Sequence, residues 1–164
     1  MGPTPTSGWR VENIYSSCGG NFIGRHVRSY SSSSCVPSVC SSFNGFGYAV
    51  ECTSTVPSIP SNMISQVAYT SGCTGTLDVL LALVPGTCVQ PGPNGGFTAS
   101  SATCTGSNIV YTGYPIGCAG SPSSSRTTVA VGCVSNQAIY SCPSATPCVH
   151  RDTAIRYEDS KYSV

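Results

Sequence analysis

The histidines and the acidic residues are the candidate side chains for acid–base catalysis. His26 lies in the run Arg-His-Val-Arg at residues 25–28, and Asp78 with one of the 28 serines could nominally complete a nucleophilic triad. With so many serines, that match carries almost no information. A glycosidase needs two acids about the scissile bond, whereas Glu12, Glu51 and Asp78 each stand alone in the sequence. We therefore expect no catalytic residue and a protein that is not an enzyme.

Cysteine and histidine near the end of the chain could instead form a zinc site. Cys142, Cys148 and His150 are the residue types that zinc takes in tetrahedral sets. Their spacing is not a standard one, and no Cys-x-x-Cys occurs anywhere in the chain. Disulfides explain the cysteines better, so we expect no metal and no cofactor.

Composition narrows the class of protein further. Charged residues make up 8% of the 164 residues, against about a quarter in an average soluble domain. Seven Lys and Arg are balanced by six Asp and Glu, so the chain has no basic face for nucleic acid and we expect no such partner. Eleven cysteines indicate a disulfide framework, and with it an oxidising, extracellular location.

Targeting and membrane signals are weak. The first six residues lack the apolar core of a secretory leader, so no signal peptide is visible in this numbering. The longest apolar run, residues 79–84, is too short to cross a bilayer, and we expect no membrane span.

The cysteines fall into a repeated pattern. Three times a Tyr is followed closely by Cys, then by Cys-Val after 16, 14 and 14 residues, and then by a third Cys. Such self-similarity is typical of tandem arrays. The three sets are Cys18, Cys35 and Cys52; Cys73, Cys88 and Cys104; and Cys118, Cys133 and Cys142. Cys40 and Cys148 are additional.

The simplest pairing closes each copy upon itself, although spacing alone does not prove connectivity. It joins Cys18–Cys35, Cys73–Cys88, Cys118–Cys133, Cys40–Cys52 and Cys142–Cys148. Cys104 is then left as a free or intermolecular thiol, because its copy lacks the extra cysteine that the others have.

The segments between the cysteines read as β-strands. Residues 127–131 alternate between apolar and small polar side chains, and residues 77–84 are mostly apolar. Asn44-Gly45 and Asn94-Gly95 are strong hairpin signals. We expect an all-β fold of three tandem disulfide-stapled β-hairpin repeats, forming a compact sandwich- or solenoid-like body with extended terminal segments.

This organisation gives five segments. We predict an N-terminal arm at 1–12, repeats at 13–66, 67–110 and 111–150, and a charged C-terminal strand or tail at 151–164. The tail holds a partial repeat opening, in which Ile155 and Tyr157 precede Lys161 where a Cys would stand. An unpaired opening strand of this kind could complete the sheet of another copy, although a solvated tail is the alternative.

The repeat pattern resembles the cysteine-rich repeats of secreted and cell-surface proteins of amoebae, slime moulds and related microbial eukaryotes. The shared features are Tyr-x-x-x-Cys-x-Gly, a Ser/Thr/Pro-rich interval and Cys-Val, and they cover roughly residues 11–162. In the first copy Cys18 lies one residue nearer to Tyr15 than this pattern has it. The resemblance implies a matrix or surface component with no catalytic residue.

These observations favour a non-enzymatic extracellular structural protein, a homo-oligomeric subunit of a self-assembling fibre, filament or surface coat. A secreted binding module, lectin-like, adhesin-like or inhibitor-like, is the alternative, and a virion surface protein would show the same features. For a carbohydrate partner the candidate stacking residues are Trp9, Phe43, Phe46 and Tyr48, although aromatic residues in strands more often pack in the core.

Overall fold

Eleven β-strands account for the fold of the part of the chain that the structure describes, and no helix occurs there. The computed structural model describes residues 7–31, 35–93 and 95–143. The strands are β1 (Ser7–Tyr15), β2 (Phe22–Ser31), β3 (Ser38–Phe43), β4 (Phe46–Thr53), β5 (Ile64–Ser71), β6 (Thr74–Leu83), β7 (Ser100–Thr105), β8 (Asn108–Gly113), β9 (Arg126–Ala130), β10 (Gly132–Val134) and β11 (Ala138–Ser141). The predicted all-β class is therefore confirmed.

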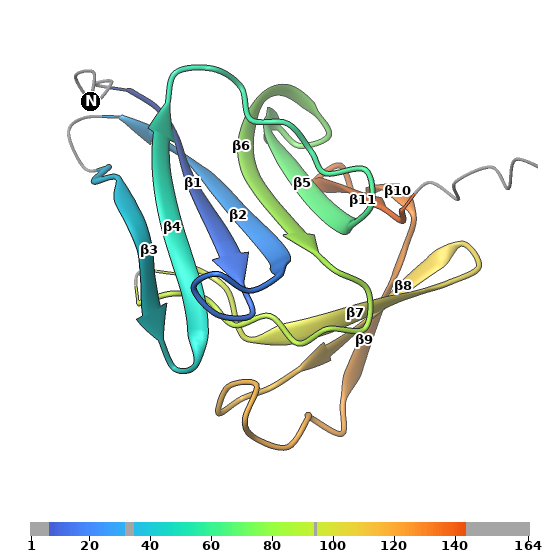
Figure 1. The fold of residues 1–164 in the computed structure, drawn as a ribbon. Coiled ribbons are helices and arrows are strands. Elements are labelled where there is room, and N and C mark those ends of the chain that lie inside the picture. The colour runs from blue at the N-terminus through green and yellow to red at the C-terminus, as the bar shows by residue number, and fades with distance from the viewer. Residues whose placement is uncertain (1–6, 32–34, 94, 144–164) are drawn as a thin grey trace, which may run out of the picture.

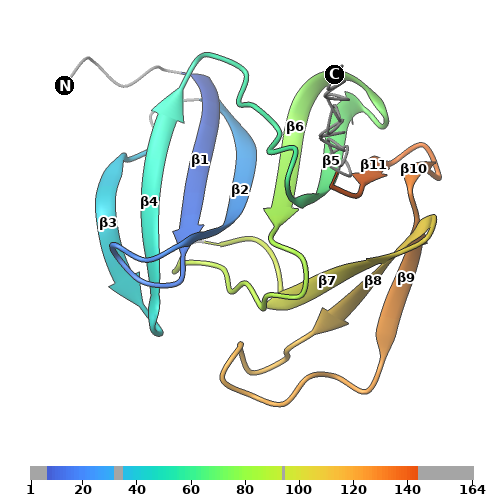
Figure 2. The same ribbon diagram turned by 45° about the vertical axis from the view of Figure 1, so that its right-hand side comes forward.

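The strands form two antiparallel sheets. The large sheet has the order β10-β11-β5-β6-β2-β1-β4-β3, and the small sheet has the order β7-β8-β9. Both ribbon views place the small sheet below the large one, beneath the ends of β5 and β6 (Figures 1 and 2). A long connection, residues 84–99, leads from β6 in the large sheet to β7 in the small one.

Local sequence explains the hairpins. Asn44 and Gly45 join β3 to β4 with φ values of 48° and 84°, as a two-residue hairpin turn with two left-handed positions requires. Cys73 lies in the turn between β5 and β6, where Gly72 has a φ of 76°. A Cβ on Gly72 would lie 1.8 Å from the carbonyl oxygen of Asn136. This glycine therefore lets the β5–β6 turn approach the turn between β10 and β11.

The predicted hairpin at Asn94-Gly95 is not found between strands in the described residues. Gly95 and Gly96 belong to the 84–99 connection, in which the amide of Gly95 donates to the carbonyl of Gly92 at 2.9 Å. Asn94 lies outside the described residues.

One apolar cluster lies between the two sheets. Ile14, Leu83 and Ile64 face it from the large sheet, and Ala102 and Ile109 face it from the small sheet. All five side chains are at most 1% exposed. Burial of these aliphatic groups, at about 25 cal/mol per Å² of apolar surface, is the hydrophobic contribution that favours packing of the small sheet against the large one.

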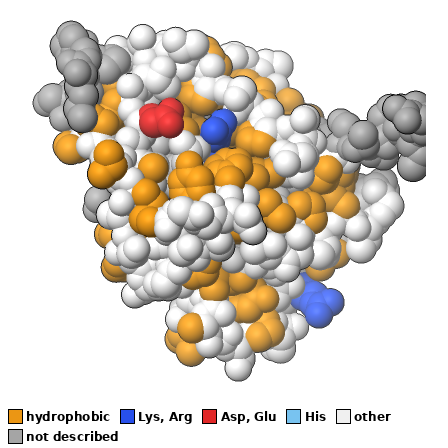
Figure 3. Space-filling view, in the orientation of Figure 1, with side chains coloured by type: hydrophobic (Ala, Val, Ile, Leu, Met, Phe, Trp, Pro, Cys, Tyr) orange, Lys and Arg blue, Asp and Glu red, His pale blue; other side chains and the backbone are white. Residues whose placement is uncertain are grey.

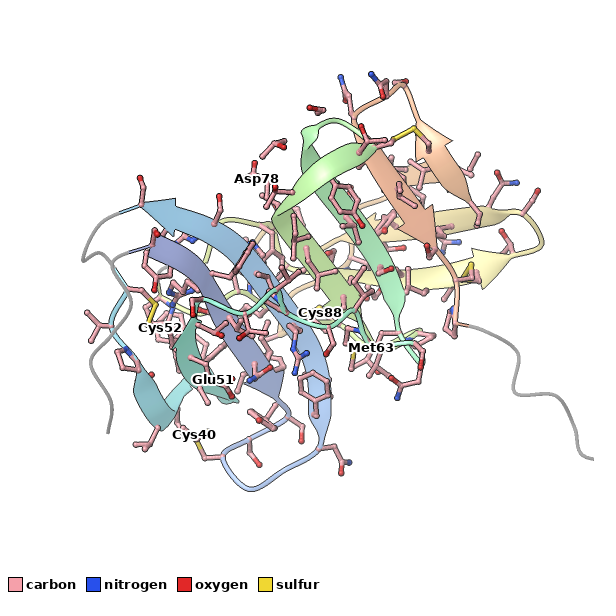
Figure 4. The ribbon with its side chains drawn as sticks, turned by 90° about the horizontal axis from the view of Figure 1, so that it is seen from above. Cys40, Glu51, Cys52, Met63, Asp78 and Cys88 are labelled. Carbon is pink, nitrogen blue, oxygen red and sulfur yellow. A yellow bond between two sulfur atoms is a disulfide. The ribbon has the colours of Figure 1, made fainter. Side chains whose placement is uncertain are left out.

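A second apolar cluster covers the opposite face of the large sheet. Val11, Val27 and Leu80 lie in neighbouring register on β1, β2 and β6, and all are buried. The β4–β5 connection, residues 54–63, crosses this face and contributes Met63, which is 2% exposed (Figure 4). Because both faces carry apolar side chains, the central strands do not show a simple alternation of apolar and polar residues.

Five disulfides connect the ten described cysteines, and none of them is a pair that we predicted. The bonds are Cys18–Cys40, Cys35–Cys52, Cys73–Cys133, Cys88–Cys118 and Cys104–Cys142. Cys40 and Cys52 mark the β3 edge of the large sheet in Figure 4. Cys104 is bonded to Cys142 and is not a free thiol. Cys148 lies outside the described residues.

Strand length explains why the predicted staples do not form. Cys73 lies in the turn before β6, and Cys88 follows the far end of that strand. A strand of ten residues spans roughly 33 Å at 3.3 Å per residue. A disulfide requires a Cα separation of about 4.4–6.8 Å. Cys73 and Cys88 therefore sit at opposite ends of β6, and each must find a partner elsewhere.

The observed partners follow a reciprocal rule between the second and third predicted repeats. The first cysteine of each of these repeats pairs with the second cysteine of the other, as Cys73–Cys133 and Cys118–Cys88. The third cysteines of the two repeats, Cys104 and Cys142, pair with each other. The two disulfides of the first predicted repeat stay within it. Strands from all three predicted repeats pair with one another in the large sheet. The three repeats are therefore not seen as separate hairpin units, and the three-repeat organisation stays a prediction.

The predicted terminal segments are only partly covered by the structure. β1 begins at Ser7, so residues 7–12 of the expected arm belong to the large sheet, where Val11 is 3% exposed. The arm was expected because the first residues are rich in proline, but the apolar face of β1 requires burial. Ile155, Tyr157 and Lys161 lie outside the described residues.

Disulfide mapping tests this connectivity. Peptides from unreduced protein should contain the Cys104–Cys142 link, and alkylation of denatured, unreduced protein should label one thiol per chain at Cys148, because the ten other cysteines are paired. Mass spectrometry of the alkylated peptides measures both. Labelling at Cys104 would contradict the structure.

Stability measurements test the role of the bond between the sheets. Replacing both Cys104 and Cys142 with Ala should lower the free energy of unfolding by about 2–5 kcal/mol, the usual cost of a disulfide in a small secreted domain. Chemical denaturation monitored by circular dichroism measures the change. A matched Cys35→Ala/Cys52→Ala variant removes a bond within the large sheet. The Cys35→Ala/Cys52→Ala variant should keep the Tyr111–Tyr140 contact between the sheets, whereas the Cys104→Ala/Cys142→Ala variant should lose it. Near-ultraviolet circular dichroism would report the difference.

Candidate binding cleft between the sheets

The 84–99 connection lies against the large sheet and also pairs with the small one. The amide of Val84 donates to the carbonyl of Ile23 at 3.0 Å. Val89 and Ser100 exchange two backbone hydrogen bonds of 2.9 and 3.0 Å, and Gly86 donates to Ala102 at 2.8 Å. The connection therefore covers the outer edge of β7 and then continues across the face of the large sheet.

A buried carboxylate and a tyrosine hold the middle of this connection. Glu12 is 1% exposed. Its carboxylate accepts from the amide of Gly92 at 3.2 Å and from Nη2 of Arg10 at 2.9 Å. A Cβ on Gly92 would lie 3.1 Å from the ring of Tyr48 and 3.2 Å from the Glu12 carboxylate. Such partners are what a buried carboxylate requires.

Tyr48 supplies the second attachment. Its hydroxyl is within hydrogen-bond distance of the carbonyl oxygens of Gln90, at 3.0 Å, and Pro91, at 3.3 Å. Burial, with the nearby Glu12 charge as the smaller cause, raises the pKa of Tyr48 to about 12. The hydroxyl therefore stays protonated at neutral pH and can donate.

His26 lies directly across from Glu12 on the neighbouring strand. It is 4% exposed, and its ring packs edge-on against Phe97 of the connection with 5.2 Å between centroids. Nδ1 of His26 is buried without a hydrogen-bond partner. Burial is the main cause that lowers the pKa of His26 to about 4; the Glu12 charge opposes this shift, and the Arg28 and Arg10 charges add to it. The imidazole is therefore neutral at pH 7 and acts as part of the apolar support for Phe97.

Glu12 and His26 begin a row of cross-strand neighbours, and this row continues across the large sheet to the floor of a cleft. Register places His26 beside Leu81, Leu81 beside Gln66, and Gln66 beside Tyr140. Side chains in such a row share one face of the sheet. The same face is thus covered by the connection at one end and open to the small sheet at the other.

The first cavity, which we call the inter-sheet cleft, has a volume of about 310 Å³. Its floor comes from the large sheet, its roof from β8 and β9, and its side wall from the end of the connection. The lining residues are Gln66, Leu81, Phe97, Thr98, Ser100, Tyr111, Gly113, Thr127, Val129 and Tyr140. This volume falls within the usual range for small-molecule sites.

Two tyrosines face each other across the cleft. The rings of Tyr111 and Tyr140 make an edge-to-face contact with 6.3 Å between centroids. Burial, and secondarily Tyr140, raises the pKa of the Tyr111 hydroxyl above its usual value. Both rings are half-buried, so each has surface left to contact a ligand.

A second cavity, of about 480 Å³, adjoins the first, because Phe97 and Thr98 line both. It lies between the connection, the tip of the β3–β4 hairpin and the β8–β9 connection. Its other lining residues are Phe43, Asn44, Gln90, Pro91, Gly92, Pro93, Ala99, Tyr114, Pro115, Ile116 and Gly117. The β8–β9 connection is held to this wall by the Cys88–Cys118 disulfide and by the amide of Cys118, which donates to Oε1 of Gln90 at 3.1 Å.

The side chains predicted from sequence as candidates for chemistry lie elsewhere. Ser29 donates to Asp78 from the neighbouring strand. His26 lies three residues before Ser29 on β2 and so points to the opposite face of the sheet. The nominal combination of His26, Asp78 and serine is therefore not assembled through Ser29. Cys142, considered for zinc, is in a disulfide, and the described residues hold no group of three His, Cys, Asp or Glu side chains that could bind a metal.

The aromatic candidates are mostly structural. Tyr48 is buried, Phe46 packs on the cluster between the sheets, and Nε1 of Trp9 donates to the carbonyl of Leu77 at 2.8 Å. Phe43 of that set lines the second cavity. Tyr111, Tyr140 and Phe97 come from three separate segments and share no motif, so nothing in the sequence marked them as site residues.

No protein-family model, curated protein or solved structure matches this chain. Over the described residues, no helix is long and apolar enough to cross a membrane. Function must therefore be inferred from the chain's own residues.

The buried His26 predicts a pH dependence of stability. Its pKa is about 4 in the folded protein and about 6.5 in an unfolded chain. The unfolded state therefore binds the proton first as pH falls, and the free energy of unfolding should decrease by about 3 kcal/mol between pH 7 and pH 4. Denaturant titrations over this range measure the slope. In His26→Gln this part of the slope should disappear, while the carboxylates titrate as before; an unchanged slope would show that His26 is not its source.

Proposed function

We propose that this protein is a non-enzymatic extracellular structural protein, a subunit that assembles with copies of itself into a fibre, filament or surface coat. The five disulfides suit an oxidising environment outside the cell. Few charged side chains occur on the face seen in Figure 3, where apolar side chains gather across the middle. Low net charge favours association between copies.

The observation that carries this proposal is the open edge strand β3. It forms one end of the large sheet and pairs only with β4 among the described strands. Its sequence contains no charged residue, and Val39 is 82% exposed. Val36, just before the strand, is 74% exposed. Soluble proteins usually protect an edge with charge or proline, because an unprotected edge recruits another strand.

The other edges are better protected. β9 begins with Arg126, and β10 is only three residues long. The outer edge of β7 is bonded to the 84–99 connection. β3 does have an irregular register between Ser38 and Ser41, but its pairing with β4 is regular from Ser41 to Phe43. Of the edges that the described strands form, a neighbouring copy would therefore meet an accessible, uncharged one of several residues at β3.

We take the donor to be the segment from Ile155 to Lys161 of a second copy. In that sequence Ile155 and Tyr157 alternate with Arg156 and Glu158, so the first half of an added strand would place two apolar side chains on one face, while the second half of that face would be charged. Backbone pairing would supply the affinity, and the two apolar side chains would set the register. If each copy gives one strand and receives one, the contact is head-to-tail and builds an open filament.

A matched pair of charge substitutions tests the acceptor strand. Val39→Lys should abolish or shorten assemblies, because it places a charge on the β3 edge, whereas Ile116→Lys should not; the two side chains are equally exposed, at 82%. Sedimentation velocity and negative-stain imaging measure assembly size.

Deletion of residues 151–164 tests the donor and leaves all eleven cysteines in place. It should prevent assembly, as Val39→Lys does. Normal filaments from either variant would reject the corresponding strand, and an unaltered protein that stays monomeric at high concentration would reject the proposed function.

A further inference from the structure

We propose that the inter-sheet cleft and the adjoining second cavity form one groove that binds a neutral, linear oligosaccharide. This site includes Phe43 at the end of β3, but it does not rest on the assembly proposed above. Of the four aromatic residues that the sequence suggested for sugar binding, Phe43 lines this groove; Tyr48 supports its wall from behind through Gln90 and Pro91.

The aromatic lining provides the apolar half of such a site. Tyr111, Tyr140 and Phe97 are half-buried around the first cavity. The faces of their rings carry partial negative charge. A pyranose ring presents a face of C–H groups with partial positive charge, which packs on an aromatic ring without a formal charge on either side. The edge-to-face contact between the tyrosines holds them in fixed relative orientation.

The polar lining provides groups for sugar hydroxyls. Gln66, Thr98, Ser100 and Thr127 line the first cavity, and Asn44 and Gln90 line the second. Hydroxyl and amide groups both donate and accept hydrogen bonds, as sugar hydroxyls do. An apolar ligand such as a lipid chain would leave several of these groups without partners, and this carries a cost.

The absence of charge from the lining selects a neutral ligand. No Asp, Glu, Lys, Arg or His occurs among the described residues that line either cavity. A sulfated or uronic-acid sugar would lose hydration in the groove and gain no opposite charge in return. A phosphorylated ligand fails for the same reason.

The presence of two joined cavities points to a chain of sugars. Each cavity combines aromatic rings with an amide side chain: Tyr111, Tyr140 and Gln66 in the first, Phe43, Tyr114 and Gln90 in the second. Phe97 and Thr98 line both cavities. A single sugar would occupy one cavity, whereas a linear oligosaccharide could pass Phe97 and occupy both.

The walls are set before a ligand arrives. The Cys104–Cys142 and Cys88–Cys118 disulfides fix the small sheet and the β8–β9 connection, and Glu12 and Tyr48 fix the 84–99 connection. A pre-organised groove avoids the cost of ordering loops on binding.

Calorimetry on the oxidised, full-length protein tests the proposal. The probes are neutral hexasaccharides of glucose, mannose and N-acetylglucosamine in α and β linkage, the corresponding disaccharides, and a sulfated hexasaccharide. At least one neutral hexasaccharide should bind, at least tenfold more tightly than its disaccharide and than the sulfated probe.

Two neighbouring threonines on β9 give a matched pair of variants. Thr127 lines the cleft, whereas Thr128 does not, and both side chains are exposed. Thr127→Arg should weaken binding at least tenfold by filling the cleft, and Thr128→Arg should leave it unchanged. Because these are surface positions, both variants should fold. Tyr140→Ala should also weaken binding, whereas Tyr140→Phe, which keeps the ring, should retain most of it.

Each outcome bears on one part of the proposal. Failure of every neutral probe to bind at millimolar concentration would overturn it, as would preference for the sulfated probe. Equal affinity for a disaccharide and its hexasaccharide would remove the second cavity from the site. Equal effects of Thr127→Arg and Thr128→Arg would place binding elsewhere on the protein.

Discussion

The small sheet keeps its place because disulfides, as well as apolar contacts, attach it to the rest of the molecule. The strands of the small sheet are at most six residues long, and its apolar face is buried only where it packs against the large sheet. Cys104–Cys142 ties β7 to the end of β11, and Cys88–Cys118 ties the β8–β9 connection to the 84–99 connection. The cleft can therefore stay open between the sheets, because covalent bonds at its margins replace part of the packing that would otherwise close it.

Buried polar groups hold the 84–99 connection as the disulfides hold the small sheet. Glu12 receives the amide of Gly92, Tyr48 contacts two carbonyl groups, and neutral His26 supports Phe97. A long connection without strands of its own would otherwise leave backbone groups unpaired against the sheet. The row from Glu12 to Tyr140 thus serves two purposes along one face, since one end fixes the connection and the other forms the floor of the cleft.

Low charge connects the two proposed properties of the protein. It leaves β3 without the charged side chains that usually prevent edge pairing, and it leaves the cleft lined by hydroxyl, amide and aromatic groups. A matrix or coat subunit that also holds a neutral glycan would combine contacts with its own copies and contacts with a surrounding polysaccharide. The two surfaces meet at Phe43, the end of β3, but Val39 on the β3 edge and Thr127 in the cleft can each be altered without the other.

The sequence by itself determined the class of fold, several strands and the position of the β3–β4 turn. Alternation in residues 127–131, the apolar run at 77–84 and Asn44-Gly45 depend on local backbone preferences and side-chain periodicity, which neighbouring residues already specify. Disulfide partners and the cleft were decided only by the tertiary structure. Cys73 meets Cys133, and Tyr111 meets Tyr140, because strands distant in sequence become neighbours in space. Equal spacing along the chain carries no information about which strand ends meet.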